Sequence, residues 1–212
     1  IILGAHGVAR CLAQILKRNG QEVICIDENP RACNQAENEG IKVFYGNALE
    51  ERVLQQAEPG TRKGIIALSG NEEVNFIFSQ RAKYLEKNMT ILTGIKNRSE
   101  GIARKMVMET GARIPFGRAA DMEQWSQWLR QDSATCQNYI YPESKQDHEI
   151  SDPNMIGILL PLTIRRGKSI EPIDNLYKPK EKDIVYFLIN KQKHEEANSW
   201  LQTHNWLKNP PT

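Results

Sequence analysis

The feature that most constrains the fold is the alternation of short apolar runs with helix-like segments over residues 1 to about 131. The expected strands are 1–3, 22–26, 41–45, 64–68, 89–95 and 112–116, and the expected helices include 8–18, 48–57, 71–87, 99–110 and 119–129. Largely apolar strands separated by helices indicate a parallel sheet that is covered on both faces. Right-handed crossovers then make this an α/β, doubly wound, Rossmann-like domain.

The second part of the chain has a different character. Residues 132–154 are polar, contain two prolines and lack a helical period, so they are expected to form a linker. Residues 155–190 are strand-rich and predict a smaller β-rich (α+β) domain. Residues 191–212 are expected to form a helical tail with Trp200, His204 and Leu207 on one face. The expected organisation is therefore a 1–131 domain, a linker, a small domain and a tail.

Composition excludes several classes of protein. A formal net charge of +2 gives no reason to expect a nucleic-acid partner. No apolar run approaches the roughly 18 residues that a membrane-spanning helix needs, and no signal peptide is expected. The four cysteines form no C-x-x-C pair, and Cys25 lies in an apolar run, where a buried reduced thiol in the cytosol is expected. Because Ile1 is not methionine and already lies in a strand, we expect a piece of a longer polypeptide, or one whose first residues are removed or disordered.

The first ten residues, I-I-L-G-A-H-G-V-A-R, look like a phosphate-binding turn between a strand and a helix. Read as G-x-G-x-x-A, the motif positions are Gly4, His6 and Ala9, and only the second departs from the pattern. Read as G-x-x-G-x-x-G, they are Gly4, Gly7 and Arg10, and the third departs. The third position packs the helix closely on the sheet, which suits alanine and not arginine. The first register is therefore favoured.

In that register His6 stands where a backbone must come closest to a pyrophosphate. Its ring would crowd a dinucleotide, although it could also donate a hydrogen bond to a phosphate. A purely structural turn is the alternative. Asp27 lies 23 residues after Gly4 at a strand end, where a carboxylate accepts from ribose hydroxyls. Its charge would repel a 2′-phosphate, so AMP, ADP, ATP or NAD(H) is favoured over NADP. A helix cap before Pro30 is the other interpretation of Asp27.

These runs, together with V-I-C-I-D-E, F-Y-G-N-A and I-I-A-L-S-G-N-E-E-V-N, resemble the N-terminal domain of RCK (regulator of K⁺ conductance) and TrkA proteins. The run I-L-L-P-L-T-I-R-R-G-K-S-I-E-P, followed by L-Y-K-P-K-E-K-D-I-V-Y-F-L, resembles the small TrkA C-terminal domain. The resemblance covers residues 1 to about 118 and about 155 to 190. It depends mainly on finding both modules in this order.

The resemblance implies a regulatory module on the cytoplasmic side of a membrane. Such a module controls a potassium channel, a potassium uptake system or a Na⁺(K⁺)/H⁺ antiporter through nucleotide or ion binding and dimerisation. The membrane part is expected in the same polypeptide upstream of Ile1. Met122, Trp125 and Trp128 would form a dimer surface if they are exposed, or would pack on the sheet if they are not.

The resemblance also implies a set of nucleotide-binding residues. They are Gly4, Ala5, His6, Gly7, Val8, Ala9, Asp27, Glu28, Asn47, Ala48, Ser69, Gly70 and Asn75. Apart from His6, three positions depart from the family pattern. Asn47 replaces the aspartate of G-D-A, Gly7 replaces a basic residue that often follows the second glycine, and Gly94 replaces an arginine that often reaches phosphate.

No catalytic or metal-binding residues are predicted. His148, His194 and His204 lack metal spacing and are expected to be solvated. The acidic stretches 147–149 and 195–196 could attract Ca²⁺, but solvated charge is favoured. The basic turn 165–168 is expected to be solvated, with a partner contact as the alternative. The alternatives to a regulatory module are an NAD-dependent oxidoreductase and a docking or dimerisation module with a degenerate nucleotide site.

Overall fold

The computed structural model describes residues 1–96, 102–142, 150 and 152–209. Its first sheet has the order β3-β2-β1-β4-β5 and is parallel throughout. The strands are β1 (Ile2–Leu3), β2 (Ile24–Asp27), β3 (Lys42–Tyr45), β4 (Gly64–Ala67) and β5 (Thr90–Thr93). The strand order reverses between β1 and β4, and ligands of doubly wound sheets bind at such a switch point. The predicted fold class is confirmed.

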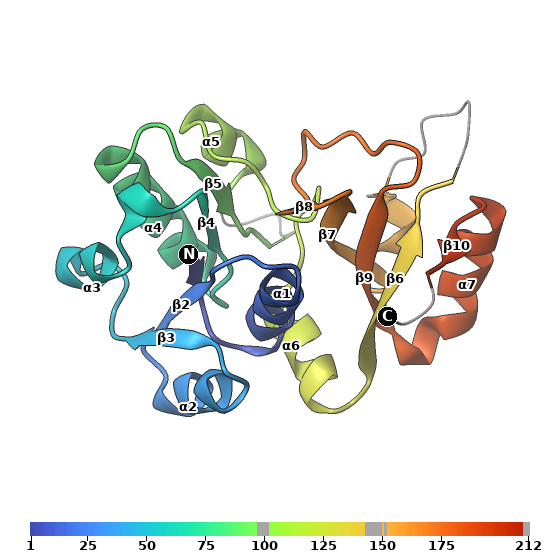
Figure 1. Ribbon diagram of the computed structural model, residues 1–212, viewed down its shortest axis with the longest axis horizontal. Coiled ribbons are helices and arrows are strands. Elements are labelled where there is room, and N and C mark those ends of the chain that lie inside the picture. The colour runs from blue at the N-terminus through green and yellow to red at the C-terminus, as the bar shows by residue number, and fades with distance from the viewer. Residues whose placement is uncertain (97–101, 143–149, 151, 210–212) are drawn as a thin grey trace.

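Helices cover both faces of this sheet (Figure 1). Residues of α1 (Gly7–Arg18), α2 (Pro30–Asn38) and α6 (Met122–Arg130) join one hydrophobic cluster with one face of the strands. Residues of α3 (Glu51–Gln56), α4 (Glu72–Leu85) and α5 (Arg104–Glu109) join a second cluster with the other face. The burial of Cys25 in the first cluster agrees with its prediction, and burial raises the pKa of its thiol to about 12.

The predicted strand at 112–116 does not form a ladder. Only isolated bridges occur there, from Arg113 to Leu92 and from Pro115 to Asp174. The chain is drawn away from the parallel sheet because Phe116 adopts a left-handed conformation (φ 62°) and its N–H donates to the Ile173 carbonyl at 2.6 Å. The predicted helix at 99–110 is observed as α5 alone, and residues 99–101 lie outside the described part of the chain.

The second sheet is antiparallel, in the order β10-β6-β9-β7-β8. Its strands are β6 (Ala134–Ile140), β7 (Leu159–Arg166), β8 (Ser169–Pro172), β9 (Ile184–Asn190) and β10 (Leu207–Lys208). The linker prediction is wrong over 134–140, because β6 pairs with β9 along its whole length. Backbone pairing with a strand some fifty positions later in the chain makes this polar segment a strand, and local composition does not show it.

The helical tail is observed as α7 (His194–Thr203), and the rest of the predicted face is different. His204 stacks on Trp200 with 4.4 Å between ring centroids, and its Nδ1 lies 2.8 Å from the Trp200 carbonyl oxygen. Leu207 instead belongs to β10 and is 61% exposed. The expectation that His204 is merely solvated is therefore wrong, whereas His194 is exposed at the start of α7.

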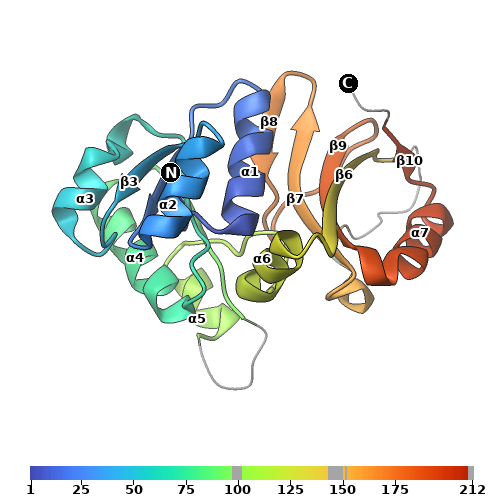
Figure 2. The same ribbon diagram turned by 90° about the horizontal axis from the view of Figure 1, so that it is seen from below.

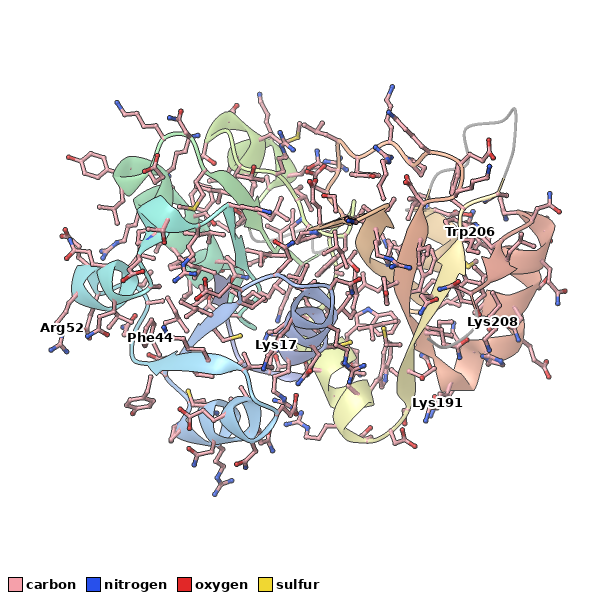
Figure 3. The ribbon with its side chains drawn as sticks, in the orientation of Figure 1. Lys17, Phe44, Arg52, Lys191, Trp206 and Lys208 are labelled. Carbon is pink, nitrogen blue, oxygen red and sulfur yellow. The ribbon has the colours of Figure 1, made fainter. Side chains whose placement is uncertain are left out.

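Helix α1 stands between the two sheets (Figure 2) and contacts β7 and β8 as well as β1 and β2. Leu12 and Ala13 share one hydrophobic cluster with Leu160, Leu162 and Leu188 of the antiparallel sheet. The other face of that sheet packs against α7 and Trp206, which lies at the opposite end of the molecule from Phe44 of β3 (Figure 3). The two sheets therefore share a core through α1.

Arg118 holds the connection between the two sheets in place. Its guanidinium is buried, and its Nη atoms donate to the backbone carbonyls of Asp152, Met155 and Leu159. Burial lowers the pKa of this group to about 10. The Asp152 carboxylate in turn accepts from Trp200 Nε1 at 2.7 Å. The start of β7 and the helix α7 are thus tied to the end of the parallel-sheet region.

Candidate nucleotide site at the first turn

The turn after β1 has the backbone geometry expected of a strand–turn–helix junction. Gly4 has a φ of +106°, a conformation that favours glycine, and its N–H donates to the Ile26 carbonyl at 2.8 Å. His6 is the N-cap residue of α1, and Ala9 is fully buried. The Arg10 side chain instead reaches back to the Ala5 carbonyl (2.8 Å). This geometry agrees with the register in which Ala9 is the third motif residue.

The His6 ring lies across this turn and links three elements. Its Nε2 contacts the Leu68 carbonyl oxygen at the end of β4, and its Nδ1 lies 2.7 Å from Ser126 Oγ on α6. A carbonyl can only accept, so Nε2 carries the proton and Nδ1 accepts from the Ser126 hydroxyl. Ser126 Oγ also accepts from the Val8 N–H at 3.2 Å. Val8 lies in the first turn of α1, where backbone N–H groups have no partner within the helix.

Gly7 serves the packing of α6 on α1. A Cβ atom on Gly7 would lie 3.1 Å from the Ser126 carbonyl oxygen and 3.2 Å from Ser126 Cα. A side chain there would therefore push α6 away. The glycine that looked like a late member of a phosphate motif is required by a helix–helix contact.

Asp27 lies at the end of β2 with both carboxylate oxygens turned toward backbone amides. Oδ2 accepts from the Ala5 N–H of the turn at 2.6 Å, and Oδ1 accepts from the Asn29 N–H at 2.8 Å. The helix-cap interpretation of Asp27 is wrong, because the Asn29 side chain caps α2. Asp27 remains partly exposed beside the turn, and the neighbouring Glu28 is exposed.

The remaining predicted residues lie in the loops that follow β3 and β4. The exposed Asn47 accepts from the Leu49 N–H at 2.9 Å, and Ala48 is buried. Asn75 is buried and binds Ser69 through both the backbone and the side chain. Gly70 is exposed near Glu123 of α6. The structure thus brings the predicted residues to the carboxyl ends of the strands, with Asn75 acting as a brace between loops.

Several residues at this edge were not predicted from the sequence. Ser126 and Glu123 come from α6, and Lys96 Nζ lies 3.8 Å from the Glu123 carboxylate. The Lys96 N–H donates at 2.7 Å to the buried Glu72 carboxylate at the start of α4. No local signal marks Ser126, because its partners lie about 120 positions earlier in the chain.

The other candidate residues have structural roles. Met122 and Trp125 are buried in the core that α1 shares, and Trp128 packs against it, so these three form no exposed dimer surface. Arg166 is exposed, as expected for the basic turn, and it also forms a bidentate pair with the buried Asp183 carboxylate (2.8 and 2.6 Å). Residues 147–149, including His148, lie outside the described residues.

Neither a metal centre nor a membrane span is found in the part of the chain that the structure describes. No group of three or more His, Cys, Asp or Glu residues there could hold a metal ion. Among the described helices, none combines the length and the apolar character that crossing a bilayer requires.

The residues at the turn fit a nucleotide only in part. Asp27 ends β2, which is the position of the ribose-binding acid in Rossmann-like sheets. The place of a diphosphate is filled: the His6 ring lies over Gly4, where an added Cβ would be 3.2 Å from Nε2, and the Val8 amide is already bound to Ser126. With His6 in this position, the ring and Ser126 occupy the space and the amide that a diphosphate would use.

The neutral state of His6 predicts a pH dependence of stability. Removal from water lowers the pKa of the ring from its ordinary 6.5; the Leu68 carbonyl, Asp27 and Glu123 act in the opposite direction, and Arg10 adds to the lowering. The unfolded chain then binds a proton that the folded chain does not, so stability falls as the pH drops below about 6.5, by at most about 1.4 kcal/mol per pH unit.

Urea unfolding between pH 7.5 and 5 should show this loss in the native chain. A His6→Gln variant, which keeps an N–H donor but does not titrate, should lose less stability over the same range. Parallel pH curves for the two proteins would contradict a His6 ring that is neutral in the folded chain.

Comparison with known proteins agrees with this fold. A family model described as the TrkA-N domain matches residues 1–114, which is more than half of the chain. A Trk system potassium uptake protein TrkA homolog from Pyrococcus horikoshii is 32% identical over 94 residues. That match covers 43% of this chain and 41% of the relative, so less than half of the relative's length is matched.

Two solved structures are also similar. The TrkA-N domain of the inner membrane protein ybaL from Escherichia coli has a TM-score of 0.50 at 18% identity, covering 61% of this chain and 93% of that chain. The GsuK RCK domain has a TM-score of 0.46 at 14% identity, covering 95% of this chain and 46% of that chain. The family match ends before α6, so Ser126 and the second sheet lie outside it.

Proposed function

Because the chain belongs to the TrkA-N domain family, we propose that it is a regulatory module that controls potassium transport across a membrane. The observation that carries this proposal is the match over residues 1–114, which contains all five strands of the parallel sheet and the Gly4 turn. A potassium uptake relative supports the same assignment. The controlled partner is a membrane channel, uptake system or Na⁺(K⁺)/H⁺ antiporter, in the same polypeptide or as a separate subunit, and the module acts on its cytoplasmic side as a homodimer.

We assign the second sheet to a TrkA-C-like unit within this module. Its support is the β7–β8 hairpin followed by β9, which lies where the sequence resembles that family. We propose that residues 1–131 form the nucleotide-binding part of the module, that 155–190 form the core of the TrkA-C-like unit and that 191–212 form its tail, with β6, from the 132–154 connection, adding a strand to the second sheet. Because the two sheets share a core, these segments are not proposed to fold independently.

The control ligand proposed for this module is an adenine nucleotide, either AMP, ADP, ATP or NAD(H). The supporting features are the Gly4 turn and the Asp27 carboxylate beside it. NADP is disfavoured because its 2′-phosphate would meet that carboxylate. In the order of the chain, the residues assigned to the site are Gly4, Ala5, His6, Gly7, Val8, Ala9, Asp27, Glu28, Asn47, Ala48, Ser69, Gly70 and Asn75.

A thermal-shift titration of the whole chain tests the ligand. A nucleotide at 100 times its Kd adds about 2.7 kcal/mol of stability, which is roughly 5–10 °C for a chain of this size. Asp27→Ala should abolish the shift, whereas Asp132→Ala, which removes an exposed acid that pairs with Lys191, should not. No shift with AMP, ADP, ATP or NAD(H) at millimolar concentration would contradict the nucleotide assignment and favour the docking alternative.

Potassium transport needs a test in the native host. Deleting the coding sequence for residues 1–212 from the host genome should change the rate of Rb⁺ uptake several-fold. Expressing the chain again from a plasmid should restore the original rate. Uptake that is unchanged by the deletion would overturn the regulatory assignment. Steady-state turnover of NADH by the isolated chain would instead favour an oxidoreductase.

A further inference from the structure

The turn between β1 and α1, over which the His6 ring lies, contains a contact that connects the candidate nucleotide site to helix α6 and through it to the second sheet. We call the contact among His6, Ser126 and the Leu68 carbonyl the α6 latch. It joins the N-terminus of α1, the end of β4 and the middle of α6. The Ser126 hydroxyl donates to His6 Nδ1 and accepts from the Val8 N–H. Each of these groups therefore has a hydrogen-bond partner while the latch is closed.

The latch occupies the features that a phosphate would use. Free N–H groups and the dipole at a helix N-terminus form the anion site of such turns. Here the Val8 N–H is bound to Ser126, and the imidazole lies over Gly4. The α6 backbone leaves no room beside Gly7, since a Cβ atom added there would lie only 3.1 Å from the Ser126 carbonyl oxygen, and we therefore expect α6 to move together with the ring when the turn is freed.

Helix α6 is connected to the second sheet by backbone hydrogen bonds. The Ser133 N–H donates to the Trp128 carbonyl at 2.7 Å, and the Lys191 N–H donates to the Ser133 carbonyl at 2.9 Å. Lys191 directly follows β9, and α6 also contacts β6. A displacement of α6 at the turn is therefore transmitted to the central strands of the antiparallel sheet.

We propose that the α6 latch is an intramolecular gate: the His6 ring and a nucleotide phosphate exclude each other, and the phosphate enters only when α6 releases the turn. This inference rests on the proposed nucleotide site. Nucleotide binding would then favour a different position of α6 and of the sheet attached to it, which gives a regulatory module a way to report its ligand.

Isothermal titration of ADP and NAD into the 212-residue chain tests the gate. His6→Gly removes the ring and restores the glycine of the standard motif, so it should bind ADP at least tenfold more tightly than the native chain. Ser126→Ala breaks the same contact from α6 and should tighten binding several-fold, which keeps the test available if His6→Gly does not fold. His194→Gly and Ser199→Ala, both at exposed positions of α7, are the matched controls and should leave the affinity unchanged.

The outcomes separate the gate from the site. ADP binding that is equally tight in the native chain, His6→Gly and Ser126→Ala overturns the gate while leaving the nucleotide site in place. Absence of binding in all three proteins at millimolar ADP and NAD overturns both. Tighter binding in the two latch variants alone supports the gate.

Discussion

Leu162→Ala should lower the free energy of unfolding by about 3–5 kcal/mol, since it removes a fully buried side chain from the core that both sheets share. Leu162 is the extra residue of a β-bulge in β7, the strand that contacts α1. Relaxation around the missing side chain is limited because helix α1 is packed from both sides. The loss should therefore affect the whole chain.

Urea unfolding of Leu162→Ala measured by far-ultraviolet circular dichroism and by tryptophan fluorescence should give one transition. The tryptophans report on both faces of the second sheet, with Trp125 in the core that the two sheets share and Trp200 and Trp206 in the cluster on the other face. Leu207→Ala, at an exposed position of β10, should change stability by less than about 0.5 kcal/mol. Two separate transitions would show that the sheets unfold independently and would contradict the shared core.

Gly94→Arg, which introduces the arginine that the family resemblance implies at this position, should unfold or severely destabilise the chain instead of improving phosphate binding. A Cβ atom on Gly94 would lie 2.8 Å from the Ala67 carbonyl oxygen, and the Gly94 N–H donates to that same oxygen at 2.8 Å. Overpacking typically costs about 1–3 kcal/mol, and a buried charge without a partner adds to it. We expect a total loss above about 3 kcal/mol.

Chemical unfolding of Gly94→Ala separates the two contributions, because alanine introduces the Cβ without the charge. Gly60→Ala is the control, since its added Cβ would make an ordinary contact, 3.7 Å from a Glu86 side-chain oxygen. Gly94→Ala should be less stable than the native chain by about 1–3 kcal/mol, and Gly60→Ala should be close to neutral. A stable Gly94→Arg protein that binds ADP more tightly would contradict this prediction, because it would show that the backbone around Gly94 can make room for a side chain.

Much of the first sheet could be predicted because its signals are local. Apolar runs such as 64–68 have no polar face to expose, which predicts buried parallel strands, and all five strands of the first sheet are indeed parallel. The Gly4 turn was predicted for the same reason, since it needs a backbone conformation that favours glycine. The position of Asp27 at the end of β2 followed from its spacing.

The secondary-structure predictions are wrong where partners that are distant in the chain decide the structure. Residues 112–116 look like a sixth strand, but Phe116 and Pro115 bond to the loop around 173–174. Residues 134–140 look like a linker, but β9 supplies a pairing partner for every residue of β6. In both segments the backbone partner lies tens of residues away in the chain, so hydrophobic periodicity within the segment could not reveal it.

The sequence by itself determined the fold class, the place of the candidate site and the anomaly at His6, because each depends on residues close together in the chain. Only the tertiary structure decided what His6 does. Its partner Ser126 comes from a helix 120 positions later, and Gly7 is explained by the approach of that same helix. The hydrogen bond at 2.7 Å and the lack of room for a side chain at Gly7 depend on how α6 packs on α1, and α6 joins the core that the two sheets share.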